Sequence, residues 1–255
     1  MNALGLIYGV LFWLATLTIV AGIIYKVRIY WKTPAPLKIP TMPAPRTKGG
    51  VVLRMFREVA FFHSLFRSDK LLWIFAIMFH YALALVLLRH TRYFTETINS
   101  IVLFLQPFGK YAGFIMVLGL ALLLARRFII DRVRYISAPS DFLMLLLLIL
   151  IGISGLMMKF VSHTDIVTVK SFFISLRTFN IENWTLPADP VLLVHLTSVA
   201  LLLLVFPISK LMHAPGVFFS PTRNQVDDAR EKRHVADWAA ELDKQGVDYL
   251  SELKK

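Results

Sequence analysis

The chain of 255 residues contains no cysteine. By itself it therefore cannot ligate an iron–sulfur cluster, form a disulfide or supply a thiolate nucleophile, and any such centre must lie on a partner. Charged residues are also scarce, at 17% of the chain, while hydrophobic residues make up 57%. A soluble domain of this length carries more charge and fewer apolar residues. The composition thus indicates an integral membrane protein.

Five hydrophobic runs have about the 20 residues that a helix needs to cross a bilayer. They cover residues 4–25, 71–88, 109–125, 142–158 and 191–211. Each is predicted to be a helix, because a lipid-exposed backbone must satisfy its own hydrogen bonds. The first run has neither a preceding basic residue nor a convincing cleavage site, so we expect a retained helix rather than a signal peptide. The predicted fold class is an all-α integral membrane protein with five transmembrane helices.

Basic residues concentrate in two of the loops between these runs. Segment 26–70 contains ten Lys and Arg against two acidic residues, and the turn after the third run adds Arg126, Arg127, Arg132 and Arg134. The positive-inside rule makes both loops cytoplasmic, so the N-terminus is expected outside and the C-terminus inside. This topology accounts for the net charge of +12, and we expect no nucleic-acid partner. The expected location is the cytoplasmic (inner) membrane of a bacterium or archaeon.

Two amphipathic segments lie outside the five runs. Residues 51–66, after a stiff proline-rich connector at 34–45, place apolar side chains opposite Arg54 and Arg57, which predicts a helix in the cytoplasmic interface. Residues 233–253 predict an amphipathic helix in the tail. We therefore expect a membrane domain at 1–212, which includes the basic loop 26–70, and a cytoplasmic tail at 213–255 that docks a partner.

Four histidines in two hydrophobic segments carry the functional signal. His80 and His90 lie on the second run, and His195 and His213 lie on the fifth, the last of them at its cytoplasmic end. Polar side chains in hydrocarbon are costly and mark functional sites. Because the two runs cross in opposite directions, His90 can meet His195 near the outer face and His80 can meet His213 near the inner face. Two such pairs suggest the axial ligands of two haems.

The offsets between these histidines constrain the geometry. Ten residues on the second run span about 15 Å of helix, and eighteen residues on the fifth span about 27 Å. The mean of about 21 Å leaves room for one haem in each half of the bilayer. The mismatch predicts tilt or a bend, for which Pro207 is a plausible place. The two histidines of the second run also differ by about 80° in azimuth, which predicts tilt or local irregularity.

The remaining histidines have no partner at comparable depth. His63, His163 and His234 are therefore not expected to be ligands. A lone histidine in a membrane span is more often a packing or proton-relay residue than a metal ligand. The principal alternative function is accordingly a membrane anchor or proton-handling transporter whose intramembrane histidines bind no haem. A free-standing transmembrane reductase is a third possibility.

Several short motifs resemble a known family. They are FHSLFR at 62–67, FH at 79–80, LRH at 88–90, HAPGVFFSPT at 213–222 and RHV at 233–235. The membrane part and its histidine spacings resemble the cytochrome b subunits related to the gamma subunit of respiratory nitrate reductase. The motifs are closer still to the DsrM branch, the membrane cytochromes of the sulfite-reduction-associated DsrMKJOP complexes.

The resemblance implies a quinone-linked electron-transfer subunit of dissimilatory sulfur metabolism with two haems b. Menaquinol or menaquinone would react near the outer haem, with Lys110 as a quinol-site residue or, equally, as a snorkelling interface lysine. Arg89 and Arg92 flank His90 and could pair with haem propionates. His163 and Asp165 of the outer loop could serve proton exit, although a solvated loop is the simpler interpretation. Both directions of electron flow are compatible with the sequence.

The resemblance also implies partners. The tail helix would contact a DsrK-like cytoplasmic iron–sulfur protein, similar to a heterodisulfide reductase catalytic subunit, that passes electrons toward the sulfur carrier DsrC. The other expected neighbours are a periplasmic multihaem cytochrome c, a periplasmic ferredoxin-like protein and a second integral quinone-interacting subunit.

Overall fold

The structure is a computed structural model that describes residues 1–35, 37–228, 240–241 and 244–245. The described residues form helices, turns and loops without a β-strand. They divide into two compact units, one made of Met1–Tyr25 and Phe62–Met212 and the other of Lys26–Phe61 and His213–Lys255. Each unit is described separately below.

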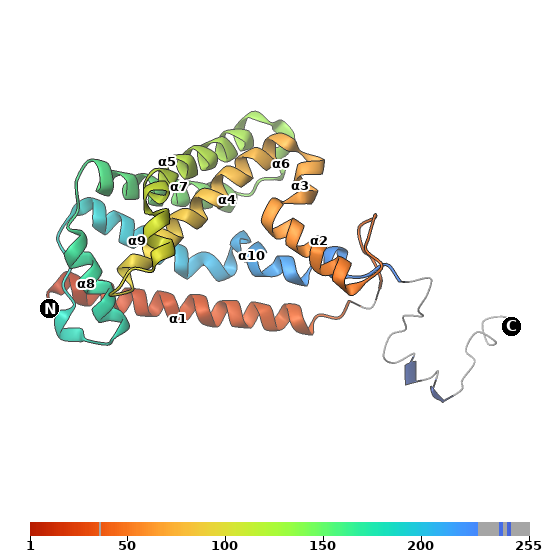
Figure 1. The fold of residues 1–255 in the computed structure, drawn as a ribbon, viewed down its shortest axis with the longest axis horizontal. Coiled ribbons are helices and arrows are strands. Elements are labelled where there is room, and N and C mark those ends of the chain that lie inside the picture. The colour runs from red at the N-terminus through yellow and green to blue at the C-terminus, as the bar shows by residue number, and fades with distance from the viewer. Residues whose placement is uncertain (36, 229–239, 242–243, 246–255) are drawn as a thin grey trace. The chain divides into compact units, whose positions relative to one another are not determined.

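Within the described residues, five helices are long and apolar enough to cross a membrane, as the sequence predicts. They are α1 (Ala3–Lys32), α4 (Lys70–His90), α5 (Ser100–Ile129), α7 (Pro139–Phe160) and α9 (Pro190–Val205) (Figure 1). Helix α5 begins nine residues before the predicted run because Asn99 caps it by accepting a hydrogen bond from the Ile101 N–H at 2.8 Å. The expectation of five spanning helices is therefore confirmed, with longer bounds for several of them.

The fifth helix ends earlier than the hydrophobic run. Helix α9 stops at Val205, and two short 3₁₀ turns at Phe206–Ile208 and Lys210–Met212 follow it. Pro207 lacks a backbone N–H and cannot continue the helical hydrogen-bond ladder. Ser209 is extended, with φ −98° and ψ 170°. The bend expected near Pro207 is present, and it is a complete break in the α-helix.

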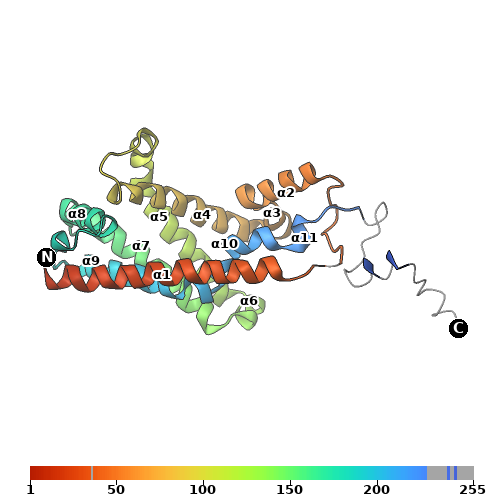
Figure 2. The ribbon, with the colours of Figure 1, turned by 90° about the horizontal axis from the view of Figure 1, so that it is seen from below.

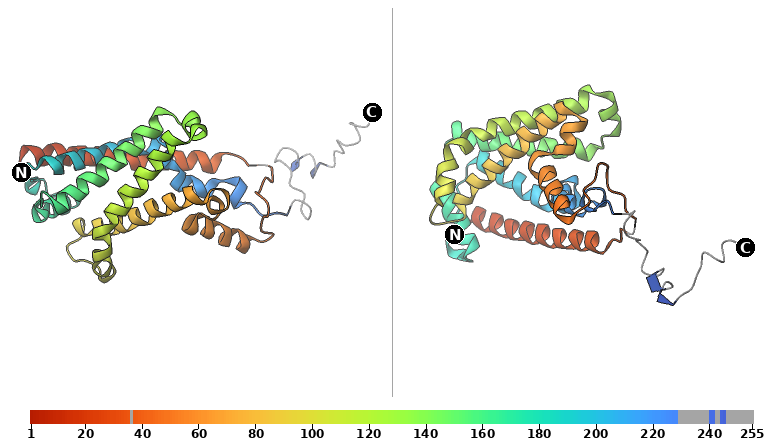
Figure 3. Two further views of the ribbon diagram at one scale, coloured as in Figure 1. Left: turned by 90° about the horizontal axis from the view of Figure 1, so that it is seen from above. Right: turned by 45° about the vertical axis from the view of Figure 1, so that its right-hand side comes forward.

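The helices of the first unit pack in chain order. Helix α4 packs along α5, α5 against α7, and α7 against α9 (Figure 3). The α4–α5 contact buries Phe79 and Ala82 against Ala112, Met116 and Leu120. Close approach requires small residues here, because a Cβ on Gly119 of α5 would lie 3.0 Å from the Phe79 backbone nitrogen.

A second apolar cluster surrounds the beginning of α1. It joins α1, α8 (Ile166–Arg177) and α9 through ten buried residues, among them Phe172 and Leu186, which are almost completely buried (Figure 2). The loop after α8 reaches α1 directly, since the Asn2 N–H donates to the Trp184 carbonyl at 3.1 Å. The Trp184 ring lies over Gly9, where an added Cβ would be 2.4 Å from a ring carbon.

Two ion pairs connect helices of the first unit near their ends. Asp69 caps α4 by accepting from the Leu72 N–H at 2.9 Å and pairs with Arg126 of α5 at 2.8 Å. The hydrogen bond from Leu72 and the Arg126 guanidinium lower the pKa of Asp69. Asp141 of α7 is buried and accepts from Lys210 at 2.7 Å. These contacts tie α4 to α5, and α7 to the segment after α9.

The segment 51–66, predicted as one helix, forms parts of two helices. The structure has α2 (Lys48–Phe61) and α3 (His63–Ser68) instead, with a break at Phe62. Phe62 adopts a left-handed conformation, with φ 49° and ψ 46°, which is rare for a bulky residue and ends the α2 ladder. Sequence periodicity carries no signal for such a backbone conformation.

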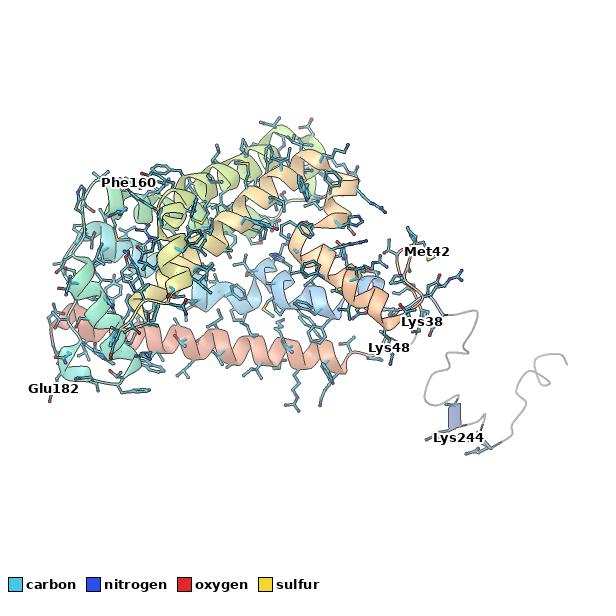
Figure 4. All side chains as sticks on the ribbon, viewed as in Figure 1. Lys38, Met42, Lys48, Phe160, Glu182 and Lys244 are labelled. Carbon is cyan, nitrogen blue, oxygen red and sulfur yellow. The ribbon has the colours of Figure 1, made fainter. Side chains whose placement is uncertain are left out.

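The second unit is held together by contacts between its two chain segments. The Thr41 N–H donates to the Thr222 carbonyl at 2.8 Å, and the Asp227 N–H donates to the Pro45 carbonyl at 2.9 Å. Helix α2 lies against α11 (Pro221–Asn224), and Lys38 pairs with Asp228 at 3.5 Å. Figure 4 labels Lys38, which lies within the connector 34–45, and Lys48, the first residue of α2. The predicted tail helix at 233–253 lies outside the described residues apart from 240–241 and 244–245.

The contact of Gly9 with Trp184 predicts sensitivity to a single methyl group. Gly9→Ala should lower the free energy of unfolding by about 1–3 kcal/mol, because the Cβ would overlap the indole ring. The measurement is the thermal unfolding midpoint of the purified protein in detergent. Gly49→Ala on α2, where an added Cβ meets nothing within 4 Å, is the control and should not lower it. Equal midpoints for the two variants would contradict the packing described here.

Candidate functional site

His90 and His195 lie close together in the first unit, with nearly parallel ring planes. His90 is the last residue of α4, and His195 is in the second turn of α9. Their ring centroids are 6.5 Å apart and their ring planes differ by 16°. His195 is buried, with 8% of its surface exposed. The structure thus brings together the two residues that the sequence assigns to the outer pair.

Hydrogen bonds fix which nitrogen of each ring carries the proton. Nδ1 of His90 lies 2.6 Å from the Val86 carbonyl oxygen, and Nδ1 of His195 lies 3.1 Å from the Ile151 carbonyl oxygen. A carbonyl only accepts, so Nδ1 must donate in both residues. In a neutral imidazole the lone pair is then on Nε2. This is the tautomer that a histidine uses to bind a metal through Nε2 while a second partner orients the ring.

The distance between the rings fits a metal between two axial imidazoles. A metal–nitrogen bond of about 2.0–2.1 Å puts each ring centroid about 3.2 Å from the metal, so two opposed ligands have centroids about 6.4 Å apart. The observed 6.5 Å agrees with this value. A direct hydrogen bond between the two rings would need one Nε2 to carry a proton, which the Nδ1 contacts exclude. The pair is therefore suited to hold the iron of a haem.

Two arginines beside this pair have buried N–H groups that need an acceptor. Among the described residues, Nε of Arg89 and Nε of Arg92 are buried and make no hydrogen bond. Arg92 donates from Nη2 to the Tyr93 hydroxyl at 2.9 Å, and Gly109 of α5 approaches the Arg89 side chain closely. Buried guanidinium groups are normally satisfied, and carboxylates are their strongest partners. Haem propionates would supply such carboxylates next to His90.

His80 lies ten residues before His90 on α4 and contacts two aromatic rings. Its Nδ1 donates to the Ala76 carbonyl at 2.8 Å, so it has the same tautomer as His90. Phe62 contacts the His80 ring edge-on, with centroids 4.9 Å apart, and Phe79 does the same at 4.7 Å. The left-handed conformation of Phe62 thus sets one side of the His80 environment. Sequence reasoning missed both phenylalanines as neighbours of this histidine.

The geometry assumed for the histidine offsets needs two corrections. His213 begins α10 (His213–Gly216) after the break at Pro207, so the eighteen residues from His195 do not follow one helix and the 27 Å estimate does not apply. Helix α4 is α-helical from Lys70 to His90, so local irregularity does not account for the azimuth between its histidines. His213 belongs to the second unit, and its pairing with His80 stays a prediction from the sequence.

Lys110 does not contact either histidine of the outer pair in any interaction that the structure describes. Its ammonium lies 5.0 Å from the Tyr111 ring centroid and 5.7 Å from that of Phe160, the last residue of α7. The preceding residue, Gly109, packs against Arg89. Lys110 therefore follows, on α5, the glycine that contacts Arg89, and its ammonium lies toward Phe160 of α7.

His63 and His163, the predicted non-ligand histidines within the described residues, and Asp165 of the outer loop lie outside the His90–His195 pair. His163 is in an exposed turn, where its Nδ1 donates to the Val161 carbonyl at 3.1 Å. Asp165 caps α8, and hydrogen bonds from the Thr168 hydroxyl and backbone lower its pKa. His63 begins α3, and His234 lies outside the described residues. Across the described part of the chain, no three His, Asp or Glu side chains gather into a metal-binding group.

Ser154 of α7 is a site residue that the sequence reasoning missed. Its Oγ lies 3.0 Å from Nδ1 of His195, and both residues are buried. A polar residue inside the apolar run 142–158 was the available signal, because polar side chains in hydrocarbon tend to have a defined partner. The periodicity alone does not show which of the other helices Ser154 faces.

The fold and this site together describe a multi-pass membrane protein with paired intramembrane histidines. Residues 60–224 match the family model described as nitrate reductase gamma subunit. The chain belongs to this family.

Two curated relatives extend the match to most of the chain. The chain is 36% identical to the "Hdr-like menaquinol oxidoreductase cytochrome b-like subunit" of Archaeoglobus fulgidus, with 92% of this chain and 84% of the relative covered. It is 34% identical to the protein of the same name from Archaeoglobus profundus, with 86% and 78% covered.

Proposed function

We propose that the chain is the dihaem b membrane subunit of an Hdr-like menaquinol oxidoreductase. In this role it exchanges electrons between menaquinol or menaquinone near the outer membrane face and a cytoplasmic iron–sulfur partner. The observation that carries the proposal is the pair of nearly parallel imidazoles of His90 and His195, of which His195 is buried. The printed names of the two relatives support the quinone link and the Hdr-like complex.

A haem held by two histidines supplies reversible one-electron chemistry at an iron with no vacant position. His90 of α4 and His195 of α9 would provide the two nitrogen ligands. Val86 and Ile151 keep the proton on Nδ1 of each ring, so that Nε2 would be free to bind the metal. Arg89 and Arg92 offer their unpaired N–H groups to the propionates.

A second haem is assigned to His80 and His213. The support is the sequence pattern, which gives each of two antiparallel spans one histidine toward each face, together with the Nδ1–H tautomer of His80. Electrons would pass between the two haems across the bilayer. This assignment follows the family pattern, and substitution of His80 and His213 tests it.

Menaquinol chemistry is assigned to the outer end of α4 and the neighbouring part of α5. Oxidation of one menaquinol to menaquinone releases two electrons and two protons, so a site of this kind needs a proton acceptor or hydrogen-bond partner. Lys110 is our candidate because it follows Gly109, which packs against Arg89. A haem would accept the two electrons of a quinol one at a time.

The cytoplasmic partner must carry the iron–sulfur chemistry. The chain has no cysteine, so a cluster that accepts electrons from the inner haem lies on another protein. We propose a DsrK-like protein of the heterodisulfide reductase type, docked at the tail 213–255 and the basic loop 26–70. The remaining partners of a DsrMKJOP-type complex are proposed on the resemblance of the HAPGVFFSPT segment.

Quinol oxidation predicts a specific electron donor for the haems. Addition of menadiol to the oxidised protein, purified with its partners in detergent, should produce a reduced b-type α band. Dithionite, which reduces accessible haem directly, gives the full amplitude for comparison. A protein whose haem responds to dithionite and not to menadiol would refute the quinone assignment. A membrane anchor or proton-handling transporter would give neither signal.

The pairing predicts which substitutions remove the same haem. His90→Ala and His195→Ala should each remove one haem, and the double variant should lose no more than either single variant. His80→Ala and His213→Ala should remove the other haem. Haem content and low-temperature absorption of the purified variants provide the measurement. His163→Ala, in an exposed turn, is the matched control and should retain both haems. Loss of different haems from the two members of a pair would overturn the assignment.

A further inference from the structure

His195 is oriented by a helix other than its own. His80 and His90 each donate from Nδ1 to the carbonyl four residues earlier on α4. Nδ1 of His195 instead meets α7, at 3.1 Å from the Ile151 carbonyl oxygen and 3.0 Å from Ser154 Oγ. Helix α7 carries no histidine of the two pairs, yet it holds one of them in place.

The direction of these hydrogen bonds follows from their acceptors. The Ile151 carbonyl requires the proton on Nδ1. The Ser154 hydroxyl donates to the Leu150 carbonyl, 2.7 Å away, or to that of Ile151 at 3.1 Å. Its oxygen lone pairs therefore face Nδ1–H and accept from it. The result is a short chain from the imidazole through the hydroxyl to the α7 backbone, in which each bond polarises the next.

The hydrogen bonds from His195 through Ser154 to the α7 backbone are buried and closely packed. Ser154 is 3% exposed and His195 is 8% exposed, so water does not compete for either group. Next to Ser154, Gly155 presents only backbone to the ring, and a Cβ there would lie 3.4 Å from His195 Cε1. The ring therefore lies close against α7.

We propose that Ser154 is a positioning residue that sets the orientation of His195 and the reduction potential of the haem it shares with His90. The proposal rests on the proposed function. An acceptor at Nδ1–H gives the imidazole more anionic character, and this strengthens its donation to the metal. Stronger donation favours ferric over ferrous iron, so Ser154 lowers the potential of this haem. Through the ring orientation it also maintains the near-parallel arrangement of the two imidazoles.

A purely structural role for Ser154 makes a different prediction. Serines in membrane helices commonly bond the carbonyl four residues earlier, and such a bond affects helix geometry without reference to a cofactor. Ser175 of α8 makes a comparable buried contact, to the Phe172 carbonyl at 2.8 Å, and the structure describes no contact between Ser175 and a histidine. Ser175→Ala is therefore the matched control.

The test is a redox titration of both haems, with low-temperature electron paramagnetic resonance of the oxidised protein, on the complex purified with its partners. Ser154→Ala should raise the potential of one haem, by up to a tenfold change in its reduction equilibrium, which is about 59 mV for one electron. The resonance of that haem should shift, and the other haem should keep its potential and signal. Ser154→Thr, which keeps the hydroxyl, should restore both properties, and Ser175→Ala should change neither.

The outcomes separate this proposal from the function on which it rests. Unchanged potentials and resonances in a haem-loaded Ser154→Ala variant would overturn the role of Ser154 and leave the haem assignment standing. Absence of haem from the unmodified protein would overturn the proposed function itself. If Ser154→Ala fails to retain the haem, Ser154→Cys, which keeps a weaker acceptor, must show the upward shift, and an unshifted potential there would refute the proposal.

Discussion

An imidazole inside an apolar helix bundle must have a use for both of its nitrogens, and this constraint organises the site. Backbone carbonyls of Val86 and Ile151 take the Nδ1 protons of His90 and His195. Nε2 of each ring then carries a lone pair that can bind a metal, and ring centroids 6.5 Å apart suit a metal between the two rings. The packing of α4 on α5, of α5 on α7 and of α7 on α9 holds these two rings at that distance.

The two ends of the first unit are stabilised by different physics. Near the beginning of α1, aromatic and aliphatic side chains of α1, α8 and α9 form one buried cluster around Phe172. At the other end, carboxylates bind the loops, with Asp69 held by Arg126 and Asp141 held by Lys210. Arginines that the positive-inside rule counts as topology signals therefore also form specific contacts. Arg126, for example, both contributes to the predicted orientation of α5 and holds the cap of α4 through Asp69.

Much of this arrangement could be predicted from the sequence. Hydrophobic length identifies five helices because a bilayer imposes that length, and the antiparallel crossing of two helices brings His90 near His195. The break after α9 was only partly foreseen, since a proline in a hydrophobic run can either kink or end a helix. The left-handed Phe62, which separates α2 from α3, and the contact of Ser154 with His195 depend on tertiary packing. No local pattern encodes either of them.

Membership in the nitrate reductase gamma subunit family gives these details a functional context. The family match covers the segment that contains His80, His90, His195 and His213, and the curated relatives carry the match across most of the chain. Within that segment, Arg89 and Arg92 lie beside His90, and Ser154 lies within hydrogen-bonding distance of His195. Such neighbours, rather than the ligands alone, tune how a buried cofactor exchanges electrons.

The central claim is that the paired histidines hold two six-coordinate haems. Its most direct test is a pyridine haemochrome determination on the purified protein, combined with absorption spectra of the reduced protein before and after addition of carbon monoxide. The account predicts two haems b per chain and a reduced spectrum that carbon monoxide does not change, because both axial positions are filled by histidine. Absence of haem, or a spectrum that shifts on binding carbon monoxide, would contradict it.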